Sequence, residues 1–328
     1  PLHNSADEID YITGDMGANT SRSLLVFDFI MNGDLDWEID GNAVAFATGF
    51  QYRQDDVSNK NYGDARCADN KPCQPELHFL PMTYDSANEN KNYAFFGELS
   101  MPVSENLDID LGVRYEDYDV DDITVPKVSA FYKMSETLAL RASYEEVFRT
   151  PIIPNAIDTS LERIGGEYYE VQTPIPTNLQ PESSDNINLG LIWTPVEGMR
   201  VNLDYYSLDM VDPIGKVSTT SPLAIYNCAD GTNYSPPAAK PDSCQLINVT
   251  TNAINGEGIE TDGLDFQMLY DFETSMGQAQ VGFNGVYLLS YDIGGCLTAG
   301  CDKYDAAGKY NTRATGSPIR VRSMPELK

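Results

Sequence analysis

The feature that most constrains the fold is an alternation of apolar and polar residues that continues for about ten residues at a time. The clearest instance, residues 107–116, reads Leu-Asp-Ile-Asp-Leu-Gly-Val-Arg-Tyr-Glu, and the pattern recurs at 92–103 and 137–148. A period of two puts the apolar set on one face of a strand and the polar set on the other. Strands of soluble sandwiches usually have roughly five to six residues, whereas strands that cross a bilayer need about ten. The alternation therefore predicts a β-barrel in a membrane.

An apolar helix, the other way to cross a membrane, is excluded by the sequence. The chain has 328 residues, of which 41% are hydrophobic, but its longest uninterrupted apolar run, Ala43 to Ala47, has only five. A membrane-spanning helix needs roughly eighteen or more. Because only helices and closed barrels satisfy their backbone hydrogen bonds in lipid, any membrane interpretation must be a barrel.

The charge balance excludes one class of partner. There are 21 Lys and Arg against 50 Asp and Glu, a net charge of -29, whereas a chain that binds nucleic acid needs a basic surface. The acidic surplus indicates either a surface that attracts cations or long, solvated acidic loops. We favour the second interpretation, because acidity reports solubility more directly than function.

The cysteines lie in three close pairs, each inside one polar segment. A zinc site is the poorer interpretation, because no C-x-x-C spacing occurs and the only histidines are His3 and His78. We expect three local disulfides in exposed loops, and hence an oxidising compartment. The pairs are Cys67 with Cys73, Cys228 with Cys244, and Cys296 with Cys301.

The lengths of the joins predict how the strands are connected. Short and long joins alternate along the chain, except that a short join at 118–122 stands where a long one is expected. In an up-and-down barrel this puts the short turns on one rim and the long loops on the other, as in outer-membrane barrels. The expected strands are 23–39, 42–55, 92–103, 106–118, 123–134, 137–148, 186–193, 199–211, 260–272, 276–291 and a truncated one from 319. The expected long loops are 57–91, 149–184, 212–259 and 293–317.

The predicted fold is therefore all-β: a partial, antiparallel, up-and-down transmembrane β-barrel of about ten strands plus a truncated eleventh. Residues 1–21 are expected to be irregular, and Asp40-Gly41 is expected to form a two-residue hairpin turn. In the strand 199–211 the alternation slips between Tyr205 and Tyr206, which predicts a β-bulge. We expect Ile109, Leu111, Leu140, Leu189 and Phe266 to face lipid, and Asp110, Arg141 and Asn188 to face the lumen.

Motifs for catalysis or for binding a cofactor are missing from the sequence. There is no Gly-rich phosphate loop and no G-x-S-x-G elbow. Carboxylate pairs occur, as expected by chance among fifty acidic residues. The acidic run 117–122 lacks the Gly and the Glu that an EF-hand calcium loop requires at its sixth and twelfth positions. We expect no enzyme, no metal and no cofactor.

Several segments resemble, in order, the barrel strands of TonB-dependent outer-membrane receptors, and as a series they are specific. The resemblance covers most of residues 22–328 and implies a barrel of 22 strands closed around an N-terminal plug. It implies that residues 1–328 are part of a single barrel domain, with the plug domain absent. The segments are YAFFGELSMP (93–102), LGVRYE (111–116), PKVSAFY (126–132), LRASY with the strand end FRTP (140–151), LQPESSDNINLG (179–190, similar to N-L-x-P-E-x-S), and GIE with GLDF (258–266).

The resemblance also implies a function. It implies a cell outer membrane location and TonB-dependent transport of a scarce solute such as a ferric siderophore, cobalamin or an oligosaccharide. The partners would be the TonB complex of the inner membrane, outer-membrane lipid, and the small solute or metal chelate. A passive porin-like channel and a secreted, disulfide-bearing β-sandwich binding module remain as alternatives.

The residues that we associate with passage of the solute are charged and are predicted to face the lumen. Arg114 and Arg141 are interpreted as partners of lumen carboxylates rather than as ligands of the substrate. The full set is Asp108, Asp110, Arg114, Glu116, Arg141 and Glu145.

The predicted orientation of the two rims can be tested by labelling inserted epitopes. An epitope inserted near Ser235, in a long loop, should be labelled on intact cells, because the long loops are expected outside. An epitope at Glu197, in a short turn, should be labelled only after the outer membrane is permeabilised. The reverse pattern would refute the predicted orientation.

Overall fold

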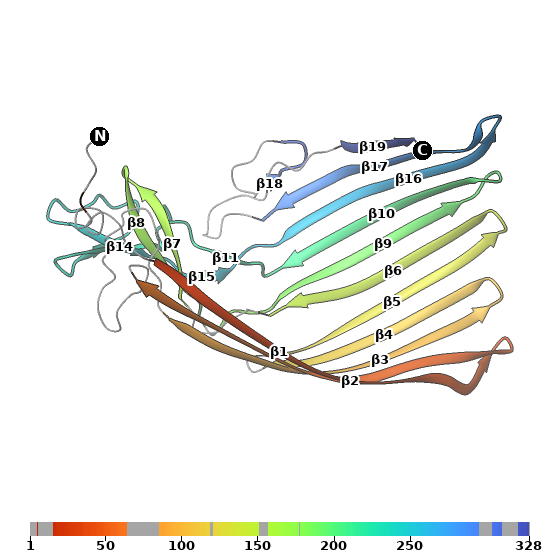
Figure 1. Cartoon of the computed structure of the whole chain (residues 1–328), viewed down its shortest axis with the longest axis horizontal. Coiled ribbons are helices and arrows are strands. Elements are labelled where there is room, and N and C mark those ends of the chain that lie inside the picture. Colours follow the sequence, from red (N-terminus) through yellow and green to blue (C-terminus); the bar gives the residue numbers. More distant parts are fainter. Residues whose placement is uncertain are drawn as a thin grey trace.

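The computed structural model describes Ser5 and residues 16–63, 85–118, 121–150, 157–176, 178–294, 304–309 and 321–327. Twelve strands form one curved sheet, which we call the wall (Figure 1). Its order is β1-β2-β3-β4-β5-β6-β9-β10-β16-β17, with β18 and β19 both paired to β17. No helix capable of crossing a membrane occurs in the described ranges.

The wall strands are long and each is antiparallel to its neighbours. Ten cross the wall, as predicted, and β19 begins where a truncated eleventh strand was expected. Among the described residues the sheet is open, with β1 at one edge and β18 and β19 at the other. The strands are β1 (Met16–Ile39), β2 (Asn42–Gly63), β3 (Ser86–Ser104), β4 (Leu107–Tyr118), β5 (Asp122–Ser135), β6 (Leu138–Arg149), β9 (Glu182–Trp193), β10 (Met199–Val211), β16 (Ile259–Thr274), β17 (Gly277–Ile293), β18 (Tyr304–Asp305) and β19 (Val321–Leu327).

The strand register separates the wall into two faces. Residues directly opposite each other across antiparallel strands share a face, so each row of partners can be followed across the sheet. One row, on the apolar face, is Met101, Ile109, Ala130, Ala142, Leu189, Tyr205, Leu264 and Tyr287. The adjacent row, on the polar face, is Ser100, Asp110, Ser129, Ser143, Asn188 and Tyr206.

The predicted division of residues between the two faces is confirmed. Leu140 and Phe266 share the apolar face through the row Leu140, Leu191, Leu203 and Phe266. Leu111 and Ile109 alternate with Asp110 on one strand, as Leu140 does with Arg141. Which face contacts lipid remains a prediction, supported by the exposure of large apolar side chains on the apolar face, such as Leu189 at 51%.

Two expectations about individual strands were wrong. β1 begins at Met16, inside the segment expected to be irregular, because residues 16–22 pair with the extension of β2 up to Gly63. The bulge expected in β10 is absent: its register with β16 is unbroken from Met199 to Met210. The apparent slip in alternation arises because Tyr206 lies on the polar face, where its ring covers Gly263 of the neighbouring strand. The irregularity of this region lies instead between Asp262 and Gly263, in the pairing of β16 with β17.

The two ends of the wall differ in their connections (Figure 1). At one end the turns are short, and the predicted two-residue hairpin at Asp40 and Gly41 has φ values of 53° and 77°. Positive φ at both positions is the geometry that a type I′ turn requires, which Asp-Gly adopts readily. The long connections lie at the other end. This confirms the predicted asymmetry of the two rims.

Aromatic rings mark where the apolar face ends, on the side of the long connections. The rings of Phe50 and Phe95 lie 5.0 Å apart, and so do those of Tyr52 and Tyr93. Aromatic residues of this kind flank the apolar band of barrels at the membrane interface.

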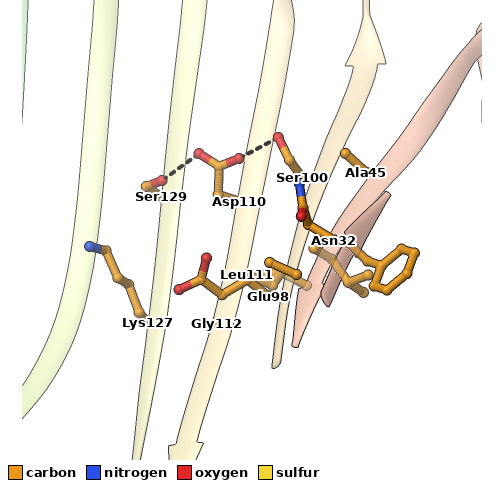
Figure 2. Close-up of a pocket in the computed structure, with 12 residues that line it drawn as sticks. Asn32, Ala45, Glu98, Ser100, Asp110, Leu111, Gly112, Lys127 and Ser129 are labelled. Carbon is orange, nitrogen blue, oxygen red and sulfur yellow. Dashed lines mark hydrogen bonds between the residues drawn. The ribbon is translucent and has the colours of Figure 1, made fainter. Parts of the chain in front are cut away.

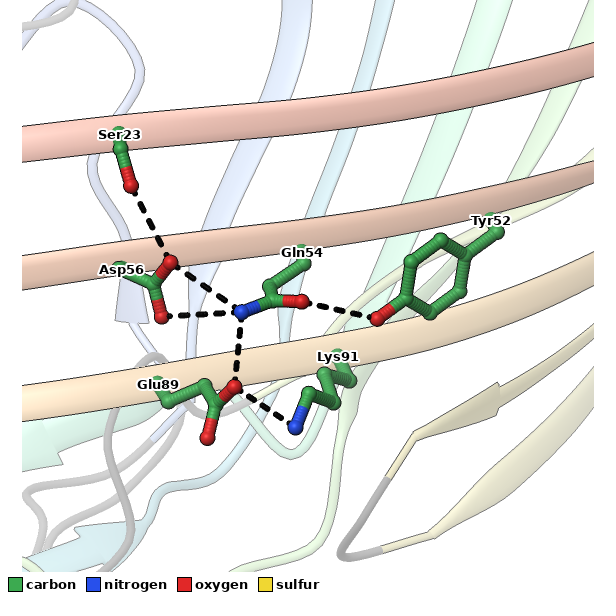
Figure 3. A network of polar contacts seen from close by, with 6 residues as sticks. All are labelled: Ser23, Tyr52, Gln54, Asp56, Glu89 and Lys91. Atoms are coloured by element: carbon green, nitrogen blue, oxygen red, sulfur yellow. Dashed lines mark hydrogen bonds and ion pairs between the residues drawn. The ribbon is translucent and has the colours of Figure 1, made fainter.

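Immediately beyond these rings the same face becomes polar (Figure 3). Gln54 accepts a hydrogen bond from the Tyr52 hydroxyl at 3.0 Å and donates to Glu89 at 2.8 Å. Asp56 accepts from Gln54 at 3.2 Å and from Ser23 at 3.1 Å. We therefore place the edge of the lipid-facing band, on the side of the long connections, between Tyr52 and Gln54.

Two of the expected long loops contribute strands to a separate sheet. Segments 149–184 and 212–259 together supply a second, five-stranded sheet, which we call the cap. Alternation along the sequence did not reveal it, because its strands are short and two of them pair in parallel across about eighty residues of sequence. The cap strands are β7 (Ile157–Ile164), β8 (Glu167–Pro174), β12 (Ile225–Cys228), β13 (Asn233–Tyr234) and β14 (Leu246–Thr250). Two further strands, β11 (Ile214–Lys216) and β15 (Ala253–Asn255), pair with each other.

The assignment of the faces predicts how a charge placed on the apolar face changes the stability of the protein in a bilayer. Leu189→Arg should destabilise the full-length protein in a bilayer by about 2–4 kcal/mol, because it places a cation on the lipid face of a central wall strand. Asn188→Arg, one residue away on the polar face, is the matched control and should cost less. Urea unfolding in lipid vesicles measures both. Equal costs for the two variants would show that the faces are wrongly assigned.

Candidate functional site

The six charged residues predicted to line the passage all lie on the polar face of the wall. Four of them are on β4, at alternate positions, and Arg141 and Glu145 are on β6. The intervening strand β5 joins the two sets, because its residues pair with both β4 and β6. The predicted placement of these charges on one face therefore agrees with the structure, while their part in the passage of a solute remains a prediction.

Asp110 lies at the centre of a hydroxyl-lined hollow (Figure 2). Its carboxylate accepts hydrogen bonds from Ser100 at 2.7 Å and from Ser129 at 3.0 Å. The small side chain of Ala45 and the absence of one at Gly112 leave a hollow of about 420 Å³ between β1 and β5. A carboxylate held by two hydroxyls, at the edge of open space, can accept a further hydrogen bond from a passing solute.

Arg141 is paired across a complete strand. Its guanidinium donates to both oxygens of Asp204, at 2.7 to 2.9 Å, although β9 lies between β6 and β10. The register explains this reach, because Arg141, Gly190 and Asp204 form one row. A Cβ at Gly190 would lie 2.2 Å from the Asp204 carboxylate and 2.5 Å from Arg141 Nε. Glycine at this position thus makes room for the bidentate pair.

Arg114 and Glu116 form a second paired cluster, nearer the long connections. Glu116 is only 7% exposed and accepts hydrogen bonds from Asn92 at 3.1 Å, from the Tyr118 hydroxyl and from Arg114. Arg114 also donates to Gln51 at 3.1 Å. The interpretation of Arg114 and Arg141 as partners of wall carboxylates is confirmed.

The two remaining residues are less constrained. Glu145 forms an ion pair with Lys127 at 3.5 Å, and both side chains are substantially exposed. Asp108 is exposed and lies two residues from Asp110 on β4. Neither is held by a carboxylate-binding cluster of the kind that surrounds Glu116, so both can respond to the charge of a solute.

A junction between the wall and the β11–β15 pair was not predicted as part of the site. Glu182 is 7% exposed and accepts a hydrogen bond from the backbone N–H of Ile214 at 2.6 Å, while its other oxygen accepts from Arg149. Arg149 and Glu182 are direct partners in the pairing of β6 with β9. They belong to the segments FRTP and LQPESS, so the family-like motifs carried a signal that residue-by-residue reasoning did not use.

Asn255 completes this junction. Its side-chain amide donates to the carbonyl oxygens of Gln180 at 2.9 Å and of Asp212 at 2.8 Å, and its oxygen accepts from the Gln180 N–H at 2.8 Å. Three chain segments are thereby joined by one side chain. The β11–β15 pair is thereby attached to the rim of the wall at the start of β9 and the end of β10.

The cap has a small core of its own and one disulfide. Val171, Ala224, Tyr226 and Val249 are buried together. Cys228 and Cys244 form a disulfide, as predicted. The other two predicted pairs, Cys67 with Cys73 and Cys296 with Cys301, lie outside the described residues. Two segments expected to be independent loops therefore form a single folded unit.

No cluster of three or more His, Cys, Asp or Glu side chains suited to a metal ion occurs among the described residues. The clusters described above contain no nucleophile paired with a base. What it provides is a charged, hydroxyl-bearing face and a folded cap at one end of it.

Comparison with known proteins places these features in context. Residues 3–326 match the family described as "TonB dependent receptor-like, beta-barrel". No curated protein matches the sequence.

Solved structures with a similar fold, all of low sequence identity, include siderophore receptors and an iron transporter. A variant of the ferric enterobactin receptor PfeA from Pseudomonas aeruginosa, in complex with enterobactin, is 14% identical, with a TM-score of 0.61 over 82% of this chain and 36% of that chain. The siderophore receptor PirA from Pseudomonas aeruginosa is 13% identical, with a TM-score of 0.59 over 83% and 46%. The FrpB iron transporter from Neisseria meningitidis is 12% identical, with a TM-score of 0.52 over 82% and 36%. The chain thus spans about a third to a half of the length of these relatives.

The role of Gly190 generates a testable prediction. Gly190→Ala should destabilise the full-length protein by about 1–3 kcal/mol, because the added methyl group displaces the Arg141–Asp204 pair. Gly97→Ala, on the apolar face of β3, is the control, since nothing lies within 4 Å of the position that an added Cβ would take. Urea unfolding midpoints in vesicles compare the two. A Gly190→Ala variant as stable as Gly97→Ala would contradict this geometry.

Proposed function

The chain belongs to the TonB-dependent receptor β-barrel family, and from this premise we propose that it forms part of a receptor that takes up a scarce solute using energy delivered through TonB. The match over residues 3–326 carries the proposal. Membership of this family also makes the chain an outer-membrane protein. Residues 1–328 would then be part of a single barrel domain, whose partners are the TonB complex of the inner membrane and outer-membrane lipid.

The division of the wall into two faces supports a lumen on the polar side. Exposed apolar side chains such as Leu189 and Phe95, at 51% and 53%, are favourable against lipid and unfavourable against water. The opposite face carries Asp110, Arg141 and Glu145, which would line an aqueous lumen. Most of these charges are paired within the wall, so the lumen is polar without holding isolated buried charges.

The cap supports a gated rather than an open channel. It is one folded unit, and the neighbouring β11–β15 pair is attached to the rim through Glu182 and Asn255. A solute that enters at this end would meet the cap before it reaches the charged face. Unstructured loops would provide no comparable surface for capture.

The solute belongs to the class of scarce nutrients: a ferric siderophore, cobalamin or an oligosaccharide. The similar structures named above bind or transport iron or siderophores according to their descriptions, which favours testing ferric chelates first. We propose no catalytic step, because the receptor's task is binding and translocation.

Transport assays in cells with and without TonB test the proposal. Cells that express the full-length protein should accumulate a radiolabelled solute from a panel of ferric siderophores, cobalamin and oligosaccharides. Deletion of tonB should reduce this uptake to the level of cells without the protein, while the amount of protein in the outer membrane stays the same.

The alternative of a passive porin-like channel gives a different result in the same assay. Uptake through a porin would be proportional to external concentration and independent of TonB. Uptake that persists unchanged in the tonB deletion strain would therefore overturn the proposal in favour of the porin.

A further inference from the structure

The cap sheet has two unlike sides. One side carries the buried residues Val171, Tyr226 and Val249. The segment before β12 covers it, because Ala224 belongs to the same core and the Tyr226 hydroxyl donates to the carbonyl oxygen of Thr219 at 3.0 Å. This side is accounted for by the folding of the cap itself.

The opposite side carries two rows of hydrogen-bonding groups, four of them neutral side chains and one, Glu170, a carboxyl. The register places Glu170, Asn248 and Asn227 opposite one another on β8, β14 and β12, and it places Gln172 opposite Thr250 in the next row. Asn227 donates to Asn248 at 2.8 Å and to Thr250 at 3.0 Å, and Gln172 donates to Glu170 at 2.6 Å. These bonds hold the side chains in fixed orientations, which reduces the entropy cost of binding a ligand.

Capacity for further hydrogen bonds remains after these contacts are made. Glu170 is 7% exposed and accepts from Gln172 through only one of its two oxygens. Burial raises the pKa of the Glu170 carboxyl. Asn248 uses its oxygen toward Asn227, and within the described part of the chain its amide nitrogen makes no hydrogen bond. Donors and acceptors thus alternate over a half-buried surface.

An aromatic ring stands beside this row. Tyr168 alternates with Tyr169 on β8, shares the side of Glu170, and is 55% exposed. The one cation nearby, Arg163, lies opposite Tyr168 and donates through Nε to the carbonyl oxygen of Gly166 at 3.2 Å. An anionic chelate would need several convergent Arg or Lys side chains, and this side of the cap does not supply them among its described residues.

We propose that this side of the cap sheet is a binding surface for a neutral, hydroxyl-rich ligand, an oligosaccharide in chemical class. The ring of Tyr168 provides a flat apolar surface for the C–H face of a sugar. Amides and a carboxyl at fixed spacing match neighbouring hydroxyls, each of which both donates and accepts. The assignment rests on the proposed function as a receptor, because it takes the cap as the place where the solute is first bound.

The proposal is tested by measuring how the purified full-length protein in detergent binds to an array of neutral oligosaccharides. The array comprises α- and β-glucans, mannans, galactans and xylans. At least one of these probes should bind saturably. Tyr168→Ala and Asn248→Ala should each weaken that binding by tenfold or more. Tyr169→Ala is the matched control, because it removes the adjacent ring from the other side of the same strand, and it should leave binding within about twofold.

The comparison of binding between the variants and the wild type is valid only if the variants remain folded. Labelling of an epitope near Ser235 on intact cells and retention of the Cys228–Cys244 disulfide report on the cap. If Asn248→Ala fails these controls, Tyr168→Ala decides the outcome alone, because its ring is already exposed.

Two results would overturn the inference. One is the absence of binding to any neutral oligosaccharide on the array. The other is equal binding by wild type and Tyr168→Ala. Because the array measures binding without TonB, either result leaves the proposed transport function standing if a ferric chelate or cobalamin is taken up in a TonB-dependent way. Loss of TonB-dependent uptake for every solute, with oligosaccharide binding intact, would instead refute the transport function alone.

Discussion

Backbone hydrogen bonding between long antiparallel strands is the constraint on which the rest of this structure depends. Lipid offers no partner to a backbone N–H or C=O, so a strand that crosses it must be paired on both sides. The wall meets this condition from β2 through β10 and on to β16, with few irregularities in register. Once the pairing is fixed, the pleat assigns each side chain to one of two environments without further choice.

The polar face shows how such a wall carries charge at low cost. Arg141 reaches Asp204 over Gly190, and Arg114 shares Glu116 with two neutral donors. Pairing keeps these charges compensated, between strands for Arg141 and Asp204 and along β4 for Arg114 and Glu116. Glu145 is substantially exposed and Asp110 is held only by two hydroxyls, so the face combines paired charges with a small number of less constrained groups.

The cap and the wall are stabilised by different interactions. The cap is built like a soluble domain, with one buried side, one polar side and a disulfide. The β11–β15 pair beside it is attached to the ends of wall strands through buried Glu182 and through Asn255.

The alternation of apolar and polar residues was enough to predict the wall, because a period of two can be recognised along one strand without knowledge of its partners. The ten strands, their two faces, the hairpin at Asp40 and the local Cys228–Cys244 pair all followed from sequence spacing. Only the tertiary structure decided which charges meet, since Arg141 and Asp204 are far apart in sequence and a strand lies between them. The same holds for the parallel pairing of β8 with β14, which creates the cap from segments that show no alternation of their own. Contacts between distant segments depend on register across the whole sheet, and that information is not contained in any one stretch of sequence.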